Sequence, residues 1–249
     1  MLTTKRIALV TGAIGGIGTE ISRQLCLDGF YVVGTFRPEN KKTAEKWLDS
    51  MQTENMNCSI KPVDVTCFDS CQQLFLDVSK TIGPISVLVN NAGITADASF
   101  RKMTQEEWCS VIDTNLNSLY NVTKLVFDQM YANGFGRIIN ISSINGQKGQ
   151  FGQANYSAAK SGIYGFTKAL AFEGARKGVT VNSVSPGYIE TEMTKKMPED
   201  VLGNMITQIP IGRLGKPREV AKAVCYLASD DAGFVTGSNL AINGGQHTY

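Results

Sequence analysis

A tyrosine and a lysine four residues apart, Tyr156 and Lys160, are the side chains of this sequence best suited to proton transfer. They begin a segment with a helical pattern, so we expect them on the same face of one helix. A phenol has a pKa of about 10, and an ammonium group a few ångströms away lowers that pKa. The pair predicts a tyrosine that gives a proton to a carbonyl oxygen and takes it back near neutral pH.

A serine upstream of the tyrosine adds a second polar group. Ser143 ends an apolar run, 137–143, that has the pattern of a buried strand. Its hydroxyl could hydrogen-bond the same carbonyl oxygen that the tyrosine protonates. Alone, a tyrosine and a lysine at this spacing usually decorate a helix surface, so the assignment also depends on the serine and on the N-terminal segment.

The N-terminal segment has the features of a dinucleotide-binding turn. Residues 6–11 form an apolar run typical of a strand buried in a parallel sheet, and a helical pattern follows. Between them stand Gly12, Gly15, Gly16 and Gly18, which let the backbone approach a pyrophosphate at the helix N-terminus. The spacing differs from the usual G-x-G-x-x-G, and a plain tight turn is the alternative interpretation.

The end of the next predicted strand, 30–36, indicates which cofactor binds. An acid at this place accepts the ribose 2′-hydroxyl of NAD, whereas an arginine suits the 2′-phosphate of NADP. The sequence has Arg37 here, no acid before Glu39, and Lys41 and Lys42 soon after. It therefore favours NADP(H), and the alternative is that these are solvated loop charges.

Strand and helix patterns alternate along the whole chain. Seven strand candidates alternate with six helical segments, without repeats or linkers. This predicts an α/β fold with one doubly wound, Rossmann-like parallel sheet of about seven strands and helices on both faces, in a single domain over residues 1–249. The polar groups fall at the carboxyl ends of strands, where such a sheet binds ligands. Residues 190–210 are polar and weakly helical, which predicts a mobile substrate lid.

Two amide-bearing positions each allow two interpretations. Residues 90–93, Asn-Asn-Ala-Gly, follow the apolar run 85–89. They suit a wall against a flat ligand, or a turn in which asparagine side chains bond their own backbone. Asn115 interrupts a long helical pattern that continues over 116–130, which indicates either a kink or a site.

Composition excludes several other functions. The chain has 249 residues with 43% apolar and 18% charged residues, as soluble enzymes have. Its net charge of +2, without a basic stripe, argues against nucleic acid. No apolar run spans a membrane and no signal-peptide pattern is present, so we expect a cytoplasmic protein. Six scattered cysteines and one histidine, His247, make a metal site or a Ser-His-Asp hydrolase improbable.

Taken together, these residues resemble the short-chain dehydrogenase/reductase family over essentially the whole chain. The resemblance rests on Thr11-Gly12-x-x-x-Gly16-x-Gly18, Asp64, Asn90-Asn91-Ala92-Gly93, Asn115, Ser143, Tyr156-x-x-x-Lys160 and Pro186-Gly187. It implies a Rossmann-like domain, often a tetramer, that transfers hydride from a nicotinamide. A homotetramer with NADP(H) is therefore expected.

The resemblance also implies a role for individual residues. Tyr156 would be the general acid, Lys160 would lower its pKa and hold the nicotinamide ribose, Ser143 would polarise the carbonyl, and Asn115 would hold a water of the proton relay. The other implied cofactor contacts are Gly12, Gly15, Gly16, Ile17, Gly18, Arg37, Asp64, Val65, Asn91, Ala92, Gly93, Pro186, Gly187, Ile189 and Thr191. Many NADP-dependent members carry arginine at the position of Gly15, so NADP preference depends here on Arg37.

Within the family, residues 92–97, 100–104, 145–153 and 185–189 are similar to those of members that reduce acetoacetyl-CoA, a 3-oxoacyl-CoA, to the (R)-3-hydroxy thioester in polyhydroxyalkanoate synthesis. The implied substrate contacts are Asp97, Lys102, Gln150, Phe151, Gln153 and Tyr188, together with Ser143 and Tyr156. The glutamines would pair with pantetheine amides and the lysine with phosphates, or else this is a flexible surface loop. The same reaction on an acyl-carrier-protein thioester is the alternative, and a non-catalytic NADP sensor is a distant one.

Overall fold

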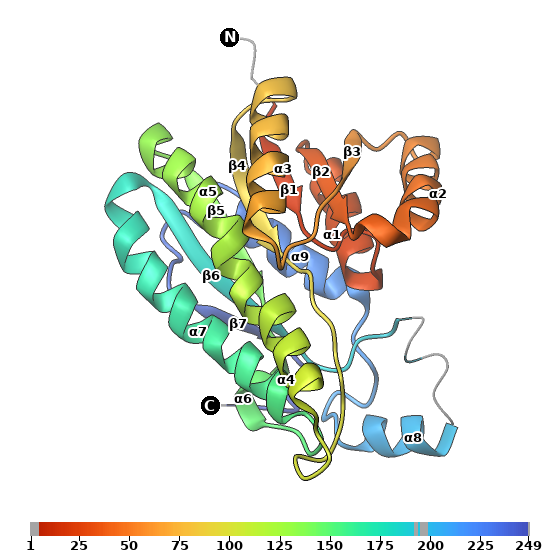
Figure 1. Ribbon diagram of the computed structural model, residues 1–249. Coiled ribbons are helices and arrows are strands. Elements are labelled where there is room, and N and C mark those ends of the chain that lie inside the picture. The colour runs from red at the N-terminus through yellow and green to blue at the C-terminus, as the bar shows by residue number, and fades with distance from the viewer. Residues whose placement is uncertain (1–4, 192–193, 195–198, 249) are drawn as a thin grey trace.

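The computed structural model describes residues 5–191, 194 and 199–248. These residues form one parallel sheet of seven strands in the order β3-β2-β1-β4-β5-β6-β7 (Figure 1). The strands are β1 (Ile7–Val10), β2 (Tyr31–Phe36), β3 (Cys58–Pro62), β4 (Ile85–Asn90), β5 (Gly136–Ile141), β6 (Val179–Pro186) and β7 (Asn239–Ile242). The predicted fold class is therefore confirmed.

Helices follow the strands in turn and cover the sheet on both faces (Figure 1). The helices are α1 (Gly16–Leu27), α2 (Lys41–Thr53), α3 (Phe68–Thr81), α4 (Gln105–Ile112), α5 (Ser118–Asn133), α6 (Ile144–Lys148), α7 (Ala154–Gly174), α8 (Glu199–Thr207) and α9 (Pro217–Ala228). Parallel neighbours in a sheet need such crossover helices, because a hairpin cannot join them.

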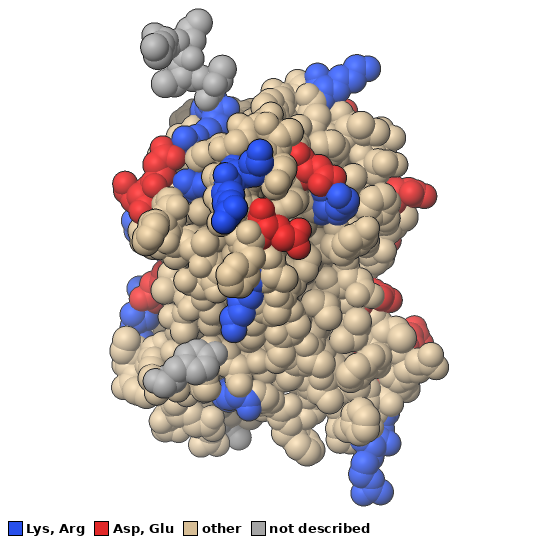
Figure 2. Space-filling model, turned by 90° about the vertical axis from the view of Figure 1, so that its left-hand side faces the viewer, with Lys and Arg blue, Asp and Glu red and all other residues tan. Residues whose placement is uncertain are grey.

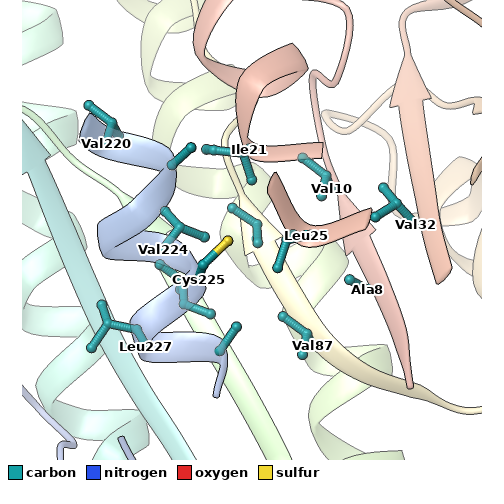
Figure 3. Packing of buried hydrophobic residues seen from close by; sticks show 14 of the residues in the cluster. Ala8, Val10, Ile21, Leu25, Val32, Val87, Val220, Val224, Cys225 and Leu227 are labelled. Atoms are coloured by element: carbon teal, nitrogen blue, oxygen red, sulfur yellow. The ribbon is translucent and has the colours of Figure 1, made fainter. Parts of the chain in front are cut away.

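Each face of the sheet has its own apolar core, because successive side chains of a strand point to opposite faces. From β1, Ala8 and Val10 pack with residues of α1, α2 and α9. Figure 3 shows side chains of α1 and α9 meeting over these strands. Ile7 and Leu9 point the other way and pack with residues of α3, α5 and α7. Burial on both faces explains why the strand sequences are continuous apolar runs.

The strand order reverses between β1 and β4. The chain runs from β1 outward to β3, returns to β4 beside β1, and continues outward to β7. At such a reversal the connections leave in opposite directions and open a crevice at the carboxyl ends of the strands. The glycine turn after β1 and residues 91–93 after β4 therefore meet at this crevice.

Some local predictions differ from the structure. The segment after Ser143, for which a flexible surface loop was one interpretation, begins with the short helix α6, which Ser143 caps. Asn115 lies in a π-helical segment, Asp113–Asn117, between α4 and α5, so the predicted irregularity is a local widening of the helix. Of the lid predicted over 190–210, residues 192–193 and 195–198 lie outside the described residues, and Glu199–Thr207 form α8.

Candidate active site

The serine, tyrosine and lysine lie together at the carboxyl end of the sheet. Ser143 follows β5, while Tyr156 and Lys160 lie in the first turns of α7. All three line a cavity of about 330 Å³. The hydroxyl oxygen of Ser143 accepts a hydrogen bond from the backbone N–H of Asn145 at 3.1 Å, so its own O–H is left to donate elsewhere.

Lys160 is held by the backbone on two sides. Its Nζ donates to the carbonyl oxygen of Ile141 at 2.8 Å, and its own carbonyl accepts from the hydroxyl of Ser142 at 2.8 Å. The side chain is buried, and burial lowers the pKa of the ammonium to about 8. A Cβ on Gly146 of α6 would lie 2.7 Å from the carbonyl carbon of Lys160, so a glycine there lets α6 approach α7.

The pKa of Tyr156 lies above its ordinary value, and Lys160 is not among the causes of that shift. Burial raises the pKa of the phenol, a hydrogen bond with Ser143 acts against this, and the negative charge of Asp97 adds to the rise. The Lys160 ammonium lies 5.6 Å from the centre of the Tyr156 ring and donates to Ile141 instead. The phenol is therefore protonated at neutral pH, which is the form that a proton donor needs.

The lowered pKa of Lys160 leads to a prediction about how stability depends on pH. An unfolded lysine has a pKa near 10.4, so between about pH 8 and 10.4 the unfolded chain binds more protons than the folded chain. The free energy of unfolding should therefore rise with pH through this window, and below about pH 8 this group should no longer change it. Lys160→Met removes this titration. Between pH 7 and pH 9.5, the free energy of unfolding of wild type should therefore rise by about 2 kcal/mol relative to that of the variant.

Urea denaturation at the two pH values measures this difference. Lys168→Met is the matched control, because Lys168 is an exposed lysine on the same helix. Parallel pH dependences for wild type and Lys160→Met would contradict the lowered pKa of Lys160.

Both ends of the Asn115 side-chain amide hydrogen-bond to the backbone of Ile94. Its Oδ1 accepts from the N–H of Ile94 and its Nδ2 donates to the carbonyl of the same residue, each at 2.8 Å. A Cβ on Gly93 would lie 2.7 Å from this Oδ1, so only a glycine fits between the strand end and the amide. The side chain thus holds the backbone of Ile94 through both ends of its amide.

A second cavity, of about 620 Å³, shares part of its lining with the first. Ile17, Gly93, Tyr156 and Thr191 line both cavities, so the phenol stands where they join. The larger cavity also contains most of the remaining predicted cofactor residues. These are Gly12, Gly15, Gly16, Gly18, Arg37, Val65, Asn91 and Ala92.

The glycine turn fits a pyrophosphate. Helix α1 begins without a side-chain cap and without an acidic residue in its first turn, so its first N–H groups and positive dipole end are available to an anion. Gly12 has φ +64°, and a Cβ on Gly18 would collide with the carbonyl oxygen of Gly12 and lie 2.8 Å from Nδ2 of Asn91. A Cβ on Gly15 would meet the same carbonyl at an ordinary 3.6 Å.

A clasp joins the glycine turn to the end of β4. The hydroxyl oxygen of Thr11 accepts from the N–H groups of Asn91 and Ala92 at 2.9 and 3.0 Å. The side-chain Nδ2 of Asn91 donates back to the carbonyls of Thr11 and Gly12 at 3.0 and 3.1 Å. Asn91 therefore lies in the cavity wall, and its side chain bonds the glycine turn rather than its own backbone.

Some of the other predicted residues line a cavity, and some line neither. Pro186, Gly187, Tyr188, Ile189 and Gln153 line the smaller cavity. Asp97 is exposed and accepts from Nε2 of Gln153 at 2.8 Å. The lining of the two cavities does not include Asp64, Lys102, Gln150 or Phe151. The carboxylate of Asp64 accepts from Thr66, and Phe151 is 89% exposed.

Four further residues that build the site were not predicted from the sequence to do so. Thr11 forms the clasp, Ser142 holds the backbone of Lys160, Asn145 lines the smaller cavity, and Tyr164 donates to the carbonyl of Ser143 at 2.9 Å. Tyr164 lies two helical turns after Tyr156 in α7, and that spacing is the signal that could have placed it on the same face.

Two other features are absent from the described part of the chain. No group of His, Cys, Asp and Glu there could hold a metal ion, and no helix there is long and apolar enough to cross a membrane. In Figure 2, Lys, Arg, Asp and Glu side chains are intermixed on the upper part of the visible face. The described residues of that face thus show no continuous positive surface of the kind that binds a phosphate backbone.

Comparison with known proteins agrees with this geometry. The family model described as enoyl-(acyl carrier protein) reductase matches residues 12–247. The chain belongs to the short-chain dehydrogenase/reductase family and is an oxidoreductase.

Two relatives named acetoacetyl-CoA reductase are about half identical to the chain. The one from Allochromatium vinosum is 53% identical over 96% of this chain and 98% of its own length. The one from Cupriavidus necator is 52% identical over 98% of this chain and 99% of its own length. A 3-oxoacyl-[acyl-carrier-protein] reductase from Haemophilus influenzae is 43% identical over 96% of this chain and 97% of its own length.

Proposed function

We propose that this protein reduces acetoacetyl-CoA, as a 3-oxoacyl-CoA, to the (R)-3-hydroxyacyl-CoA with NADPH. The observation that supports this most is the position of Tyr156 at the junction of the two cavities, one with a glycine cradle and the other lined by Ser143. The names of the relatives that are about half identical support the substrate. The intact set of serine, tyrosine, lysine and asparagine argues against a non-catalytic sensor, which needs no proton donor.

The residues of the chain divide the work of this reaction. The Ser143 hydroxyl donates to the 3-oxo oxygen and fixes its place beside Tyr156. The phenol, kept protonated by burial, gives its proton to that oxygen as charge develops there. The ammonium of Lys160, 5.6 Å from the centre of the phenol ring, would hold the nicotinamide ribose, as the family resemblance implies. The residues of the larger cavity would hold a nicotinamide cofactor, which would supply the hydride for the carbonyl carbon.

The cofactor is proposed to be NADPH because of Arg37. This residue follows β2, lines the larger cavity, and is half exposed, with Nε 3.4 Å from Glu39. A guanidinium there can pair with a 2′-phosphate. The 2′-hydroxyl of NADH would give it no such partner.

Arg37→Ala should raise the Michaelis constant for NADPH by about 10- to 100-fold, the size expected for losing hydrogen bonds to a charged group. The Michaelis constant for NADH should change little, since it carries no 2′-phosphate. Initial rates with both cofactors measure this. Lys46→Ala removes an exposed charge from α2 and serves as the control. Equal changes for the two cofactors would mean that Arg37 does not read the phosphate.

The carrier of the acyl group is tested by comparing two substrates. The kcat/KM for acetoacetyl-CoA should exceed that for the acetoacetyl acyl-carrier-protein thioester by on the order of tenfold, because CoA brings phosphates that a lysine such as Lys102 can pair with. Initial rates with NADPH in excess measure the ratio. A large preference for the protein-borne thioester would favour the alternative, a 3-oxoacyl-(acyl-carrier-protein) reductase.

We also propose that the chain is one reductase domain over 1–249 with a substrate lid at 190–210, and that it works as a homotetramer in the cytoplasm. Its family resemblance supports the assembly. Some large apolar side chains lie outside the core: Phe172 of α7 is 87% exposed and Tyr120 of α5 is 58% exposed. Such side chains are candidates for burial between subunits. The lower part of the face in Figure 2 also carries few charges. Sedimentation of the purified protein gives the stoichiometry.

A further inference from the structure

A buried amide without an assigned role lies in the wall of the smaller cavity. Asn145 is 8% exposed, lines that cavity, and donates its backbone N–H to Ser143. Its side-chain Oδ1 is buried and has no hydrogen-bond partner among the described residues. Folded proteins rarely leave a buried acceptor unpaired, because it loses its bonds to water and gains nothing in return. In a cavity wall, a ligand can supply the missing donor.

Two neighbouring side chains fix which end of this amide is left over. A carboxylate can only accept, so Gln153 must turn its Nε2 toward Asp97, at 2.8 Å. The Oε1 of Gln153 then faces Asn145 and accepts from its Nδ2 at 2.9 Å. A reversed Asn145 would place two carbonyl oxygens against each other. The order of donors and acceptors from Asp97 onward therefore leaves Oδ1 of Asn145 as the free acceptor.

The position of this acceptor indicates which part of a substrate it meets. Asn145, Gln153 and Tyr188 line the smaller cavity and not the larger one. The 3-oxo and thioester carbonyls of a 3-oxoacyl thioester have no hydrogen to donate. The first donor along the arm is the amide N–H, two methylenes beyond the sulfur. The terminal torsion of an asparagine is broad, so the side chain can turn its Oδ1 toward such a donor.

We propose that Oδ1 of Asn145 accepts a hydrogen bond from the amide N–H nearest the sulfur of the pantetheine arm, which makes Asn145 a substrate-binding residue. This inference rests on the proposed reduction of a 3-oxoacyl thioester. CoA and acyl carrier protein present the same arm, so it applies to either carrier. The comparison of wild-type rates on the two carriers, given above, tells them apart.

Two small substrates isolate this hydrogen bond. One is the acetoacetyl thioester of N-acetylcysteamine, and the other is its analogue with an ester oxygen in place of the amide N–H. Wild type should have a kcat/KM about tenfold higher for the amide compound. Asn145→Leu, which keeps the branched shape but has no acceptor, should bring the ratio close to one by raising the KM of the amide compound. Such an effect on KM is expected of a contact remote from the reacting atoms.

A control variant and a stability measurement separate this role from a structural one. Asn57→Leu, at an exposed asparagine far along the chain from the site, should keep the wild-type ratio. Thermal unfolding shows whether Asn145→Leu folds, and the wild-type preference can be measured without any variant. The same loss on both substrates, or no preference in wild type, overturns the inference. If wild type reduces neither thioester nor acetoacetyl-CoA with NADPH, the proposed function itself fails.

Discussion

Tyr156→Phe is expected to lower kcat for acetoacetyl-CoA reduction by about 10³-fold, within the range that a positioned proton donor contributes. The substitution removes only the phenol oxygen and keeps the ring, which lies between the two cavities. Binding of NADPH should be nearly unchanged, because the glycine turn and Arg37 are untouched. The decrease in NADPH absorbance gives the rate, and the enhancement of NADPH fluorescence gives the affinity.

Tyr226→Phe is the matched control for this experiment. Tyr226 is an exposed tyrosine on α9, so losing its hydroxyl should change neither kcat nor NADPH affinity. Residual activity of Tyr156→Phe above about a tenth of wild type would refute the role of the phenol as general acid. A parallel loss of NADPH binding would instead mean that the variant disturbs the cofactor site.

The glycine turn gives the second large effect. Gly18→Ala should weaken NADPH binding by about 100-fold or more, since the new Cβ has no room beside the Gly12 carbonyl and lies 2.8 Å from Nδ2 of Asn91. Relieving that contact moves the turn against which a pyrophosphate would lie, and a displacement of this kind typically costs about 1–3 kcal/mol. Fluorescence titration with NADPH measures the affinity.

Gly15→Ala controls for the loss of a glycine in the same turn. Its Cβ would have only an ordinary contact of 3.6 Å, so NADPH affinity should stay within a few-fold of wild type. Thermal unfolding of both variants separates loss of the cofactor site from loss of the fold. If Gly15→Ala and Gly18→Ala weaken binding equally, the steric explanation is wrong.

The fold could be predicted from the sequence because its signals are local and repeated. Apolar runs such as 6–11 and 85–89 are long enough for strands buried on both faces, and a helical pattern follows each. The meeting of the glycine turn with residues 91–93 followed from the fold, since carboxyl ends of parallel strands share one edge. The hydrogen bonds of the Thr11 hydroxyl with residues 91 and 92, which fix the contact between the two segments, have no sequence signature of their own.

The electrostatics of the site could not be predicted in the same way. The spacing of Tyr156 and Lys160 placed them on one face of α7, but the pKa of each depends on burial and on partners distant in the chain. The ammonium turned to the carbonyl of Ile141, a partner that a helical pattern cannot reveal. In the same way, the free acceptor of Asn145 depends on Asp97, which lies on another segment.

The clasp of Thr11 with Asn91 and Ala92 has a consequence for local unfolding. The Thr11 hydroxyl accepts from the backbone N–H groups of the 91–92 segment, and the side-chain amide of Asn91 donates to the backbone of the 11–12 segment. Neither segment can therefore unfold locally without breaking hydrogen bonds of the other. The two halves of the sheet are thus fastened at the place where a dinucleotide would bridge them. A bound nicotinamide nucleotide would then stabilise both halves against opening, and limited proteolysis would slow across the whole crevice rather than on one side.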